Sequence, residues 1–131
     1  MDPAPRHQAR ERALELLYEA DVKGETPTSV VDALGVAPDA FTVLLVRSVD
    51  SRRAEIDGMI GDAAIGWDLE RMAVVDRNVL RLGVAELLEC DDVPTAVVRD
   101  EAVELASAYS TDDSGRFVNG VLATLAERVR G

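Results

Sequence analysis

The chain has little of what most catalytic and metal-binding sites require. Its 131 residues include one histidine, His7, and one cysteine, Cys90. A Ser–His or Cys–His nucleophile pair would have to use that single histidine, and a structural zinc site needs several such ligands at fixed spacing. A glycine-rich phosphate-binding loop is missing as well. The sequence therefore predicts a protein that is not an enzyme and that holds no metal ion and no cofactor.

Two further absences concern the cell compartment. A lone cysteine cannot form an internal disulfide, which fits a reducing environment. No apolar run approaches the roughly 20 residues of a membrane-spanning helix, and the first residues do not resemble a signal peptide. We therefore expect a cytoplasmic protein that does not associate with membranes.

Basic residues are also scarce. The chain has 25 acidic residues against 14 lysines and arginines, a formal net charge of −11. This balance argues against a general nucleic-acid binder, whose affinity would come from neutralising phosphates. It favours a basic partner, although an acidic surface that only keeps the protein soluble explains the charge equally well.

Aromatic residues make up 4% of the chain, and no segment shows the alternating pattern of a strand. Periodic apolar residues instead predict helices, which are expected over residues 5–22, 28–34, 38–64 (with a bend near Gly58 or Gly61), 71–90, 95–109 and 116–130. The predicted fold is all-α, a compact bundle of about seven helices. Residues 1–131 are expected to form a single domain with two helical halves, 1–66 and 67–131.

The helix expected over residues 71–90 is apolar around most of its circumference, so it should lie at the centre of the bundle. Two carboxylates, Asp76 and Glu86, fall inside or beside its apolar sectors. Buried charges need partners, so these residues form either structural ion pairs or parts of an interface. Glu86 lies on the same side as Val79 and Leu82, and we expect it to be buried and paired with an arginine or a backbone donor.

A few basic residues have suggestive positions. Arg6 and Arg10 lie one turn apart on the same helix face, with His7 beside them. Arg116 precedes Phe117, and such a pair at a helix start can hold a phosphate and stack a base. From spacing alone, a solvated arginine face and a core phenylalanine are the more common interpretations.

Several segments, in the right order, resemble the NusB family. Residues 6–18 (RHQARERALELLY) resemble its opening helix, and residues 76–87 (DRNVLRLGVAEL) resemble its central helix. Residues 92–94 (DVP), 101–106 (EAVELA) and 114–122 (SGRFVNGVL) resemble its C-terminal signature, of which the last segment is the most specific. The resemblance covers nearly the whole chain.

This resemblance implies a NusB-like all-α fold of two helical halves and a role in transcription antitermination without catalysis. NusB proteins pair with the small-subunit ribosomal protein NusE, and the pair binds the boxA segment of nascent ribosomal RNA leaders. The complex helps RNA polymerase to pass terminators. Carried onto this chain, the resemblance assigns RNA contacts to Arg6, His7, Arg10, Arg116 and Phe117.

The resemblance also assigns the NusE-binding surface to Asp76, Arg77 and Asp113. One departure concerns the opening helix, where His7 and Gln8 occupy positions that are commonly arginine in the family. Fewer fixed positive charges displace fewer counterions, so we expect weaker and less salt-dependent RNA binding by the protein alone.

Two alternatives remain at this level. The chain could be the RNA-recognition domain of a ribosomal RNA cytosine methyltransferase, but it ends at Gly131 with no room for a cofactor-binding α/β domain. It could also be a homodimeric helical scaffold with reduced RNA binding, because glycine and alanine on helix faces permit close packing between copies.

Overall fold

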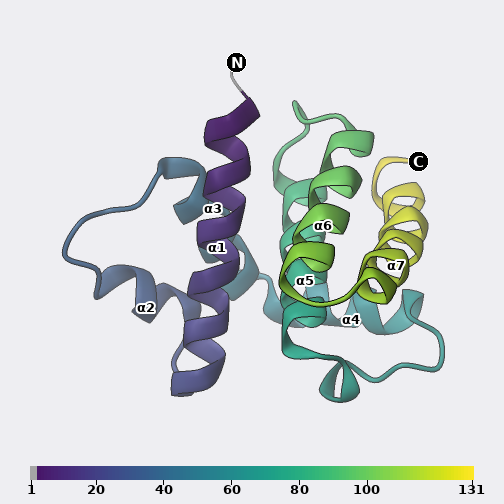
Figure 1. Ribbon diagram of the computed structural model, residues 1–131, viewed down its shortest axis with the longest axis horizontal. Helices are drawn as coiled ribbons and strands as arrows, with labels where there is room; N and C mark the ends of the chain where they lie inside the picture. Colours follow the sequence, from purple (N-terminus) through teal and green to yellow (C-terminus); the bar gives the residue numbers. More distant parts are fainter. Residues whose placement is uncertain (1–2) are drawn as a thin grey trace.

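The computed structural model describes residues 3–131, which form seven α-helices, one 3₁₀ turn and no strand (Figure 1). The elements in chain order are α1 (Pro3–Lys23), α2 (Pro27–Asp32), α3 (Ala40–Ser51), α4 (Arg53–Ala63), the 3₁₀ turn η1 (Leu69–Arg71), α5 (Val74–Glu89), α6 (Thr95–Tyr109) and α7 (Asp112–Arg130). The all-α prediction of about seven helices is confirmed. None of the helices in the described part of the chain has both the length and the apolar character that crossing a membrane requires.

Helix α5 is the centre of the bundle, as its apolar circumference predicted. Every residue from 78 to 87 is buried, and α5 packs against α1, α3, α4, α6 and α7. Gly83 allows α7 to approach closely, because a Cβ at this position would lie 2.9 Å from Cδ1 of Leu122. The central helix therefore organises both sides of the molecule.

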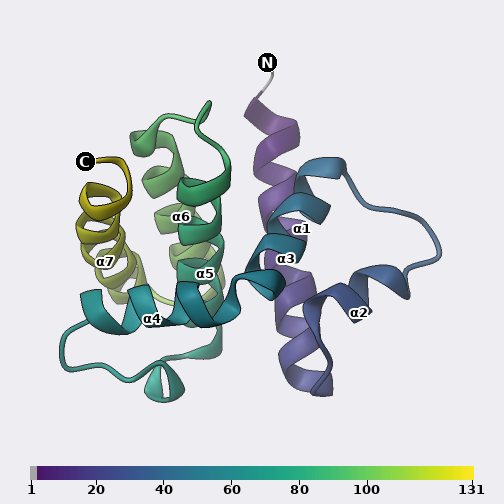
Figure 2. The same ribbon diagram turned by 180° about the vertical axis from the view of Figure 1, so that it is seen from behind.

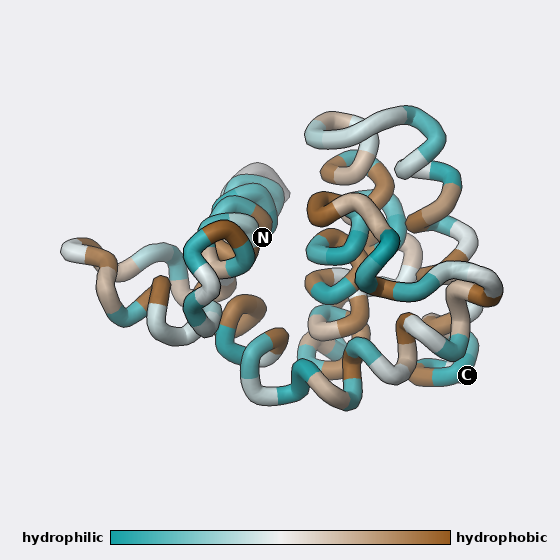
Figure 3. The backbone as a smooth tube through the Cα atoms, turned by 90° about the horizontal axis from the view of Figure 1, so that it is seen from below, coloured by the Kyte–Doolittle hydropathy of each residue, from teal (hydrophilic) through white to brown (hydrophobic). Residues whose placement is uncertain are grey.

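The helices form two groups that lie side by side. Helices α1 to α3 lie on one side of the molecule, and α5 to α7 lie on the other (Figures 1 and 2). The sequence suggested a boundary at Gly66–Trp67, but α4, which precedes it, packs against α5 and α7. The groups therefore meet near the junction of α3 and α4. Figure 3 shows polar and apolar residues alternating along the helices, the amphipathic pattern that lets each group bury one side.

The main differences from the expected helix boundaries lie at Arg52 and at the start of α7. The expected long helix over 38–64 is broken at Arg52, whose backbone leaves the helical region (φ −110°, ψ 21°), and not at Gly58 or Gly61. Helix α7 begins four residues earlier than expected, because the Thr111 hydroxyl accepts a hydrogen bond from the Ser114 amide (3.1 Å) and caps it.

Arg130, near the end of the chain, holds the C-terminus of α5. Its guanidinium donates hydrogen bonds to the carbonyl oxygens of Val93 (2.6 Å), Cys90 (2.8 Å) and Leu87 (3.2 Å). The last carbonyls of a helix lack partners within the helix and carry partial negative charge. A positive side chain therefore satisfies the end of the central helix and ties α7 to it.

Candidate functional site

Arg10, one of the predicted RNA contacts, is buried. Its side chain is paired with Glu86: Nε lies 2.9 Å from Oε1 and Nη2 lies 2.6 Å from Oε2. The two residues are 5% and 3% exposed. This confirms the expectation that Glu86 is buried and paired with an arginine. A phosphate cannot reach the Arg10 guanidinium in the folded protein, so its assignment to RNA binding is corrected to a structural ion pair.

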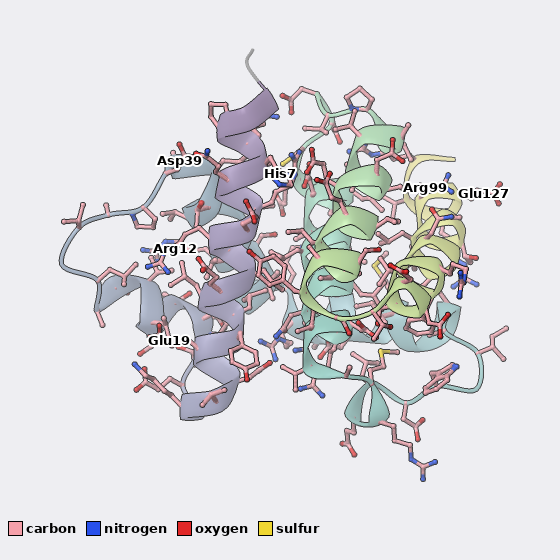
Figure 4. All side chains as sticks on the ribbon, in the orientation of Figure 1. His7, Arg12, Glu19, Asp39, Arg99 and Glu127 are labelled. Carbon is pink, nitrogen blue, oxygen red and sulfur yellow. The ribbon has the colours of Figure 1, made fainter. Side chains whose placement is uncertain are left out.

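Arg6 and His7 lie nearer the surface at the start of α1. The Arg6 guanidinium lies 3.5 Å from Oδ2 of Asp92 and 4.6 Å from the centre of the Phe41 ring. The Arg6 side chain is 24% exposed, so it is partly accessible. The His7 ring is turned toward α6, where Nδ1 lies 2.6 Å from Oε2 of Glu101. Figure 4 shows His7 between α1 and α6, whereas Arg12 extends from the opposite side of α1. Arg6 is therefore the basic residue of this group that is best placed for a phosphate.

The other two predicted RNA contacts lie at the start of α7. The Arg116 side chain is 76% exposed and pairs with Asp113 one turn earlier. The Phe117 ring packs edge-on against Trp67, with ring centres 5.7 Å apart. The starts of α1 and α7 are well separated in Figure 1. The structure thus places the five predicted RNA residues in two regions and not in one patch.

A pocket of about 290 Å³ opens beside Phe117, between the start of α5 and the start of α7. It is lined by Trp67, Met72, Ala73, Asp76, Thr111, Asp113, Ser114 and Phe117. The structure therefore brings together Asp76, Asp113 and Phe117, which the resemblance assigned to two different partners. Trp67 and Met72 also line this pocket, and the sequence analysis did not identify them. Trp67 is the single tryptophan of the chain, and this could have drawn attention to it.

Asp76 has one satisfied and one unsatisfied oxygen. Its Oδ2 accepts a hydrogen bond from the Ser114 hydroxyl (3.0 Å), which joins α5 to α7. Its Oδ1 is shielded from solvent, and no donor among the described residues lies within hydrogen-bonding distance of it. A buried acceptor without a partner costs free energy, commonly about 1–3 kcal/mol. Asp76 therefore contributes to the fold through Ser114 and carries an unpaired acceptor beneath the surface of the pocket.

Arg77, which was assigned to the partner surface, is occupied within the chain. Its Nη1 donates to the carbonyl oxygen of Leu69 (3.2 Å), and its Nη2 lies 3.8 Å from Oδ2 of Asp21. The guanidinium holds η1 and the end of α1 against α5, so the structure gives Arg77 a structural position.

A second pocket, of about 350 Å³, lies on the other side of the start of α5, between α1 and α6. It is lined by Leu14, Glu15, Tyr18, Val75, Asn78 and Tyr109. Tyr18 and Tyr109 remain 49% and 45% exposed. Because Val75 and Asp76 are adjacent, the two pockets flank the same helix turn. We call them together the α5-start surface.

Most arginines in the described part of the chain have a carboxylate within 4 Å. This group includes Arg6, Arg10, Arg12, Arg47, Arg52, Arg81 and Arg116. Together with the net charge of −11, these pairs leave little free positive charge. The electrostatics of the chain alone favour a basic partner over a polyanion.

Comparisons with known proteins agree with this architecture. The NusB family model matches residues 7–127. The transcription antitermination protein NusB of Saccharopolyspora erythraea is 51% identical over 127 residues, spanning 92% of this chain and 86% of that protein. The structure of T. maritima NusB matches with a TM-score of 0.83 at 32% identity, covering 93% of this chain and 90% of that one. A structure of the antitermination factors NusB and NusE in complex with dsRNA matches with a TM-score of 0.80 at 31% identity, covering 95% of this chain and 98% of that one.

Proposed function

This chain belongs to the NusB family, and on that basis we propose that it is a transcription antitermination factor that binds RNA together with NusE. The related complex of NusB, NusE and dsRNA supports both partners. The RNA is the boxA segment of nascent ribosomal RNA leaders, and the bound pair acts within the antitermination complex on RNA polymerase.

The α5-start surface is the observation that carries the NusE part of the proposal. It offers exposed aromatic rings and two apolar pockets. Aromatic residues beside apolar pockets commonly carry much of the energy of protein–protein interfaces. The exposed carboxylate of Asp113 at its edge suits a basic ribosomal protein, since complementary charge steers and orients docking.

The RNA part of the proposal rests on few charges. With Arg10 buried, Arg6 and Arg116 are the predicted basic contacts that remain accessible, and each already faces an aspartate. Two phosphate contacts contribute little affinity through counterion release. The NusE partner therefore supplies much of the positive charge that holds the RNA, and tight RNA binding belongs to the heterodimer.

A matched pair of charge reversals tests the docking surface. Asp113→Lys places a positive charge at the first pocket, the one lined by Trp67 and Phe117. Asp112→Lys makes the same change one residue away, outside that pocket. Both residues are exposed in the first turn of α7, so both variants lose the same favourable interaction with the helix dipole. Asp113→Lys should weaken NusE binding at least about tenfold, or 1.4 kcal/mol, and Asp112→Lys should change it much less.

Calorimetric titration of NusE into each variant gives the two affinities. Equal loss in both variants would mean that only the overall charge matters and that the pocket is not the docking site. Measuring the mass in solution with and without NusE also tests the homodimer alternative, because a dimer that persists in the presence of NusE would favour the scaffold interpretation.

A further inference from the structure

The His7 ring lies among three carboxylates from two helices. On α1, Glu11 follows His7 by one turn, and its Oε1 lies 3.5 Å from Nε2 of His7. On α6, Glu101 and Glu104 are also one turn apart. Oε2 of Glu101 lies 2.6 Å from Nδ1 of His7, and Oε1 of Glu104 lies 4.0 Å from Nε2. Figure 4 shows the ring in the space between these two helices.

We propose that Nε2 of His7, with the carboxylates of Glu11 and Glu104, forms a binding site for a divalent transition-metal ion such as Zn²⁺. Bonds of about 2.0–2.1 Å in a tetrahedral site place the ligand atoms about 3.4 Å apart. The separations of 3.5 Å and 4.0 Å are close to this value, and rotation of the exposed Glu104 side chain completes the geometry.

The groups behind the ligands are those that metal sites in proteins use. A metal-binding histidine usually donates its other ring N–H to a carboxylate, which fixes the tautomer and orients the ring. Glu101 accepts that hydrogen bond at Nδ1. Glu11 is held similarly, since its Oε2 accepts a hydrogen bond from the Tyr109 hydroxyl (2.9 Å) while Oε1 faces His7. Glu101 and Tyr109 are thus positioning residues for the two ligands of α1.

Charge also favours a cation at this position. When Nδ1 carries the proton, the lone pair of Nε2 faces the oxygens of Glu11 and Glu104. The neighbouring cation, Arg10, is paired with Glu86 and reaches Glu101 only at 3.7 Å. A proton on His7 partly neutralises these carboxylates. The hydrogen bond to Glu101 raises the pKa of His7, burial opposes this shift, and the charges of Glu101, Glu104 and Glu11 raise the pKa further. A metal ion competes with that proton, so metal binding strengthens as the pH rises through the raised pKa.

The ligand set indicates the class of metal. One imidazole nitrogen with two carboxylates suits Zn²⁺, Co²⁺ or Ni²⁺, whereas Mg²⁺ prefers oxygen ligands alone and retains its water. A bound ion would connect α1 to α6 across the two helix groups and would add positive charge one residue from Arg6. Sequence analysis could not find this site, because its ligands on α1 and α6 lie more than 90 residues apart in the chain.

Zinc titration of the intact protein by calorimetry at pH 7.5 tests the proposal. The unsubstituted protein should bind one Zn²⁺, and His7→Gln and Glu104→Gln should each weaken binding at least about tenfold, as losses at metal sites typically do. Glu15→Gln is the matched control, because it removes the same charge from α1 at a residue whose carboxylate faces Arg12. Glu101→Gln should weaken binding by an intermediate factor because it disturbs only the orientation of His7.

Thermal melts distinguish a specific site from diffuse attraction to an acidic surface. Zn²⁺ should raise the melting temperature of the unsubstituted protein and of Glu15→Gln but not that of His7→Gln, whose metal-free melt should show that it folds. The proposal is overturned if Glu15→Gln loses as much affinity as His7→Gln, or if Mg²⁺ displaces Zn²⁺ at equal concentration.

Discussion

Replacing Glu86 with alanine removes one partner of the buried ion pair that joins α1 to α5. The two hydrogen bonds between Arg10 and Glu86 are 2.9 and 2.6 Å long, and both side chains are shielded from solvent. The variant leaves the guanidinium with Glu101, at 3.7 Å, as its remaining counter-ion. Removing one partner of a buried pair costs about 3–5 kcal/mol. Because Glu101 keeps part of the attraction, we expect the low end of this range, about 3 kcal/mol.

This loss converts into a large change in melting temperature. The entropy of unfolding is about 2.1 cal/mol/K per residue, or roughly 0.28 kcal/mol/K for a chain of this length. A loss of about 3 kcal/mol then lowers the melting temperature by about 11 °C. Circular dichroism during heating and during urea denaturation measures both quantities.

A double variant tests whether the effect comes from the Arg10 charge that Glu86→Ala leaves without its main partner. Replacing the pair with apolar residues, Arg10→Met with Glu86→Leu, removes both charges and fills the space, and such replacements are often neutral or stabilising. It should recover most of the stability that Glu86→Ala loses. An unchanged melting temperature in Glu86→Ala, or a double variant as unstable as the single one, would refute the reasoning.

Three further predictions concern the same core. Arg130→Ala should lower the free energy of unfolding by about 1–2 kcal/mol, measured in urea, because the carbonyl oxygens of Leu87, Cys90 and Val93 at the end of α5 lose their donor. Gly83→Ala should cost about 1–3 kcal/mol in the same assay, because the new methyl group meets Leu122. Burial and the nearby charge of Glu86 raise the pKa of Cys90 to about 11, so a thiol reagent at pH 8 should modify it only after unfolding. Rapid modification of the folded protein would contradict this burial.

The parts of the fold that follow from helix periodicity were predictable. An apolar circumference identified α5 as the central helix, and the limits of α6 agree with the expected residues 95–109. The break at Arg52 and the early start of α7 were not predictable in this way. The first depends on the local backbone geometry at Arg52, and the second depends on a single hydrogen bond, the cap from Thr111. Neither leaves a periodic signal in the sequence.

The candidate site shows the same limit. Helix spacing placed Arg10 on the face of Arg6, but its environment is set by Glu86, 76 residues away. Similarly, Asp76 and Phe117 share a pocket because the starts of α5 and α7 meet in the folded chain. Contacts between distant segments decide which charged residues are free to bind and which are occupied, and a periodic pattern contains no information about them.

A titration of boxA RNA with this protein, with and without NusE and at several salt concentrations, tests the central claim most directly. The protein alone should bind weakly, with a log–log salt slope of about −1.4 from two phosphate contacts on single-stranded RNA. NusE should raise the affinity at least about tenfold, or 1.4 kcal/mol. Tight binding by the protein alone, with a steep salt slope and no gain from NusE, would contradict the account.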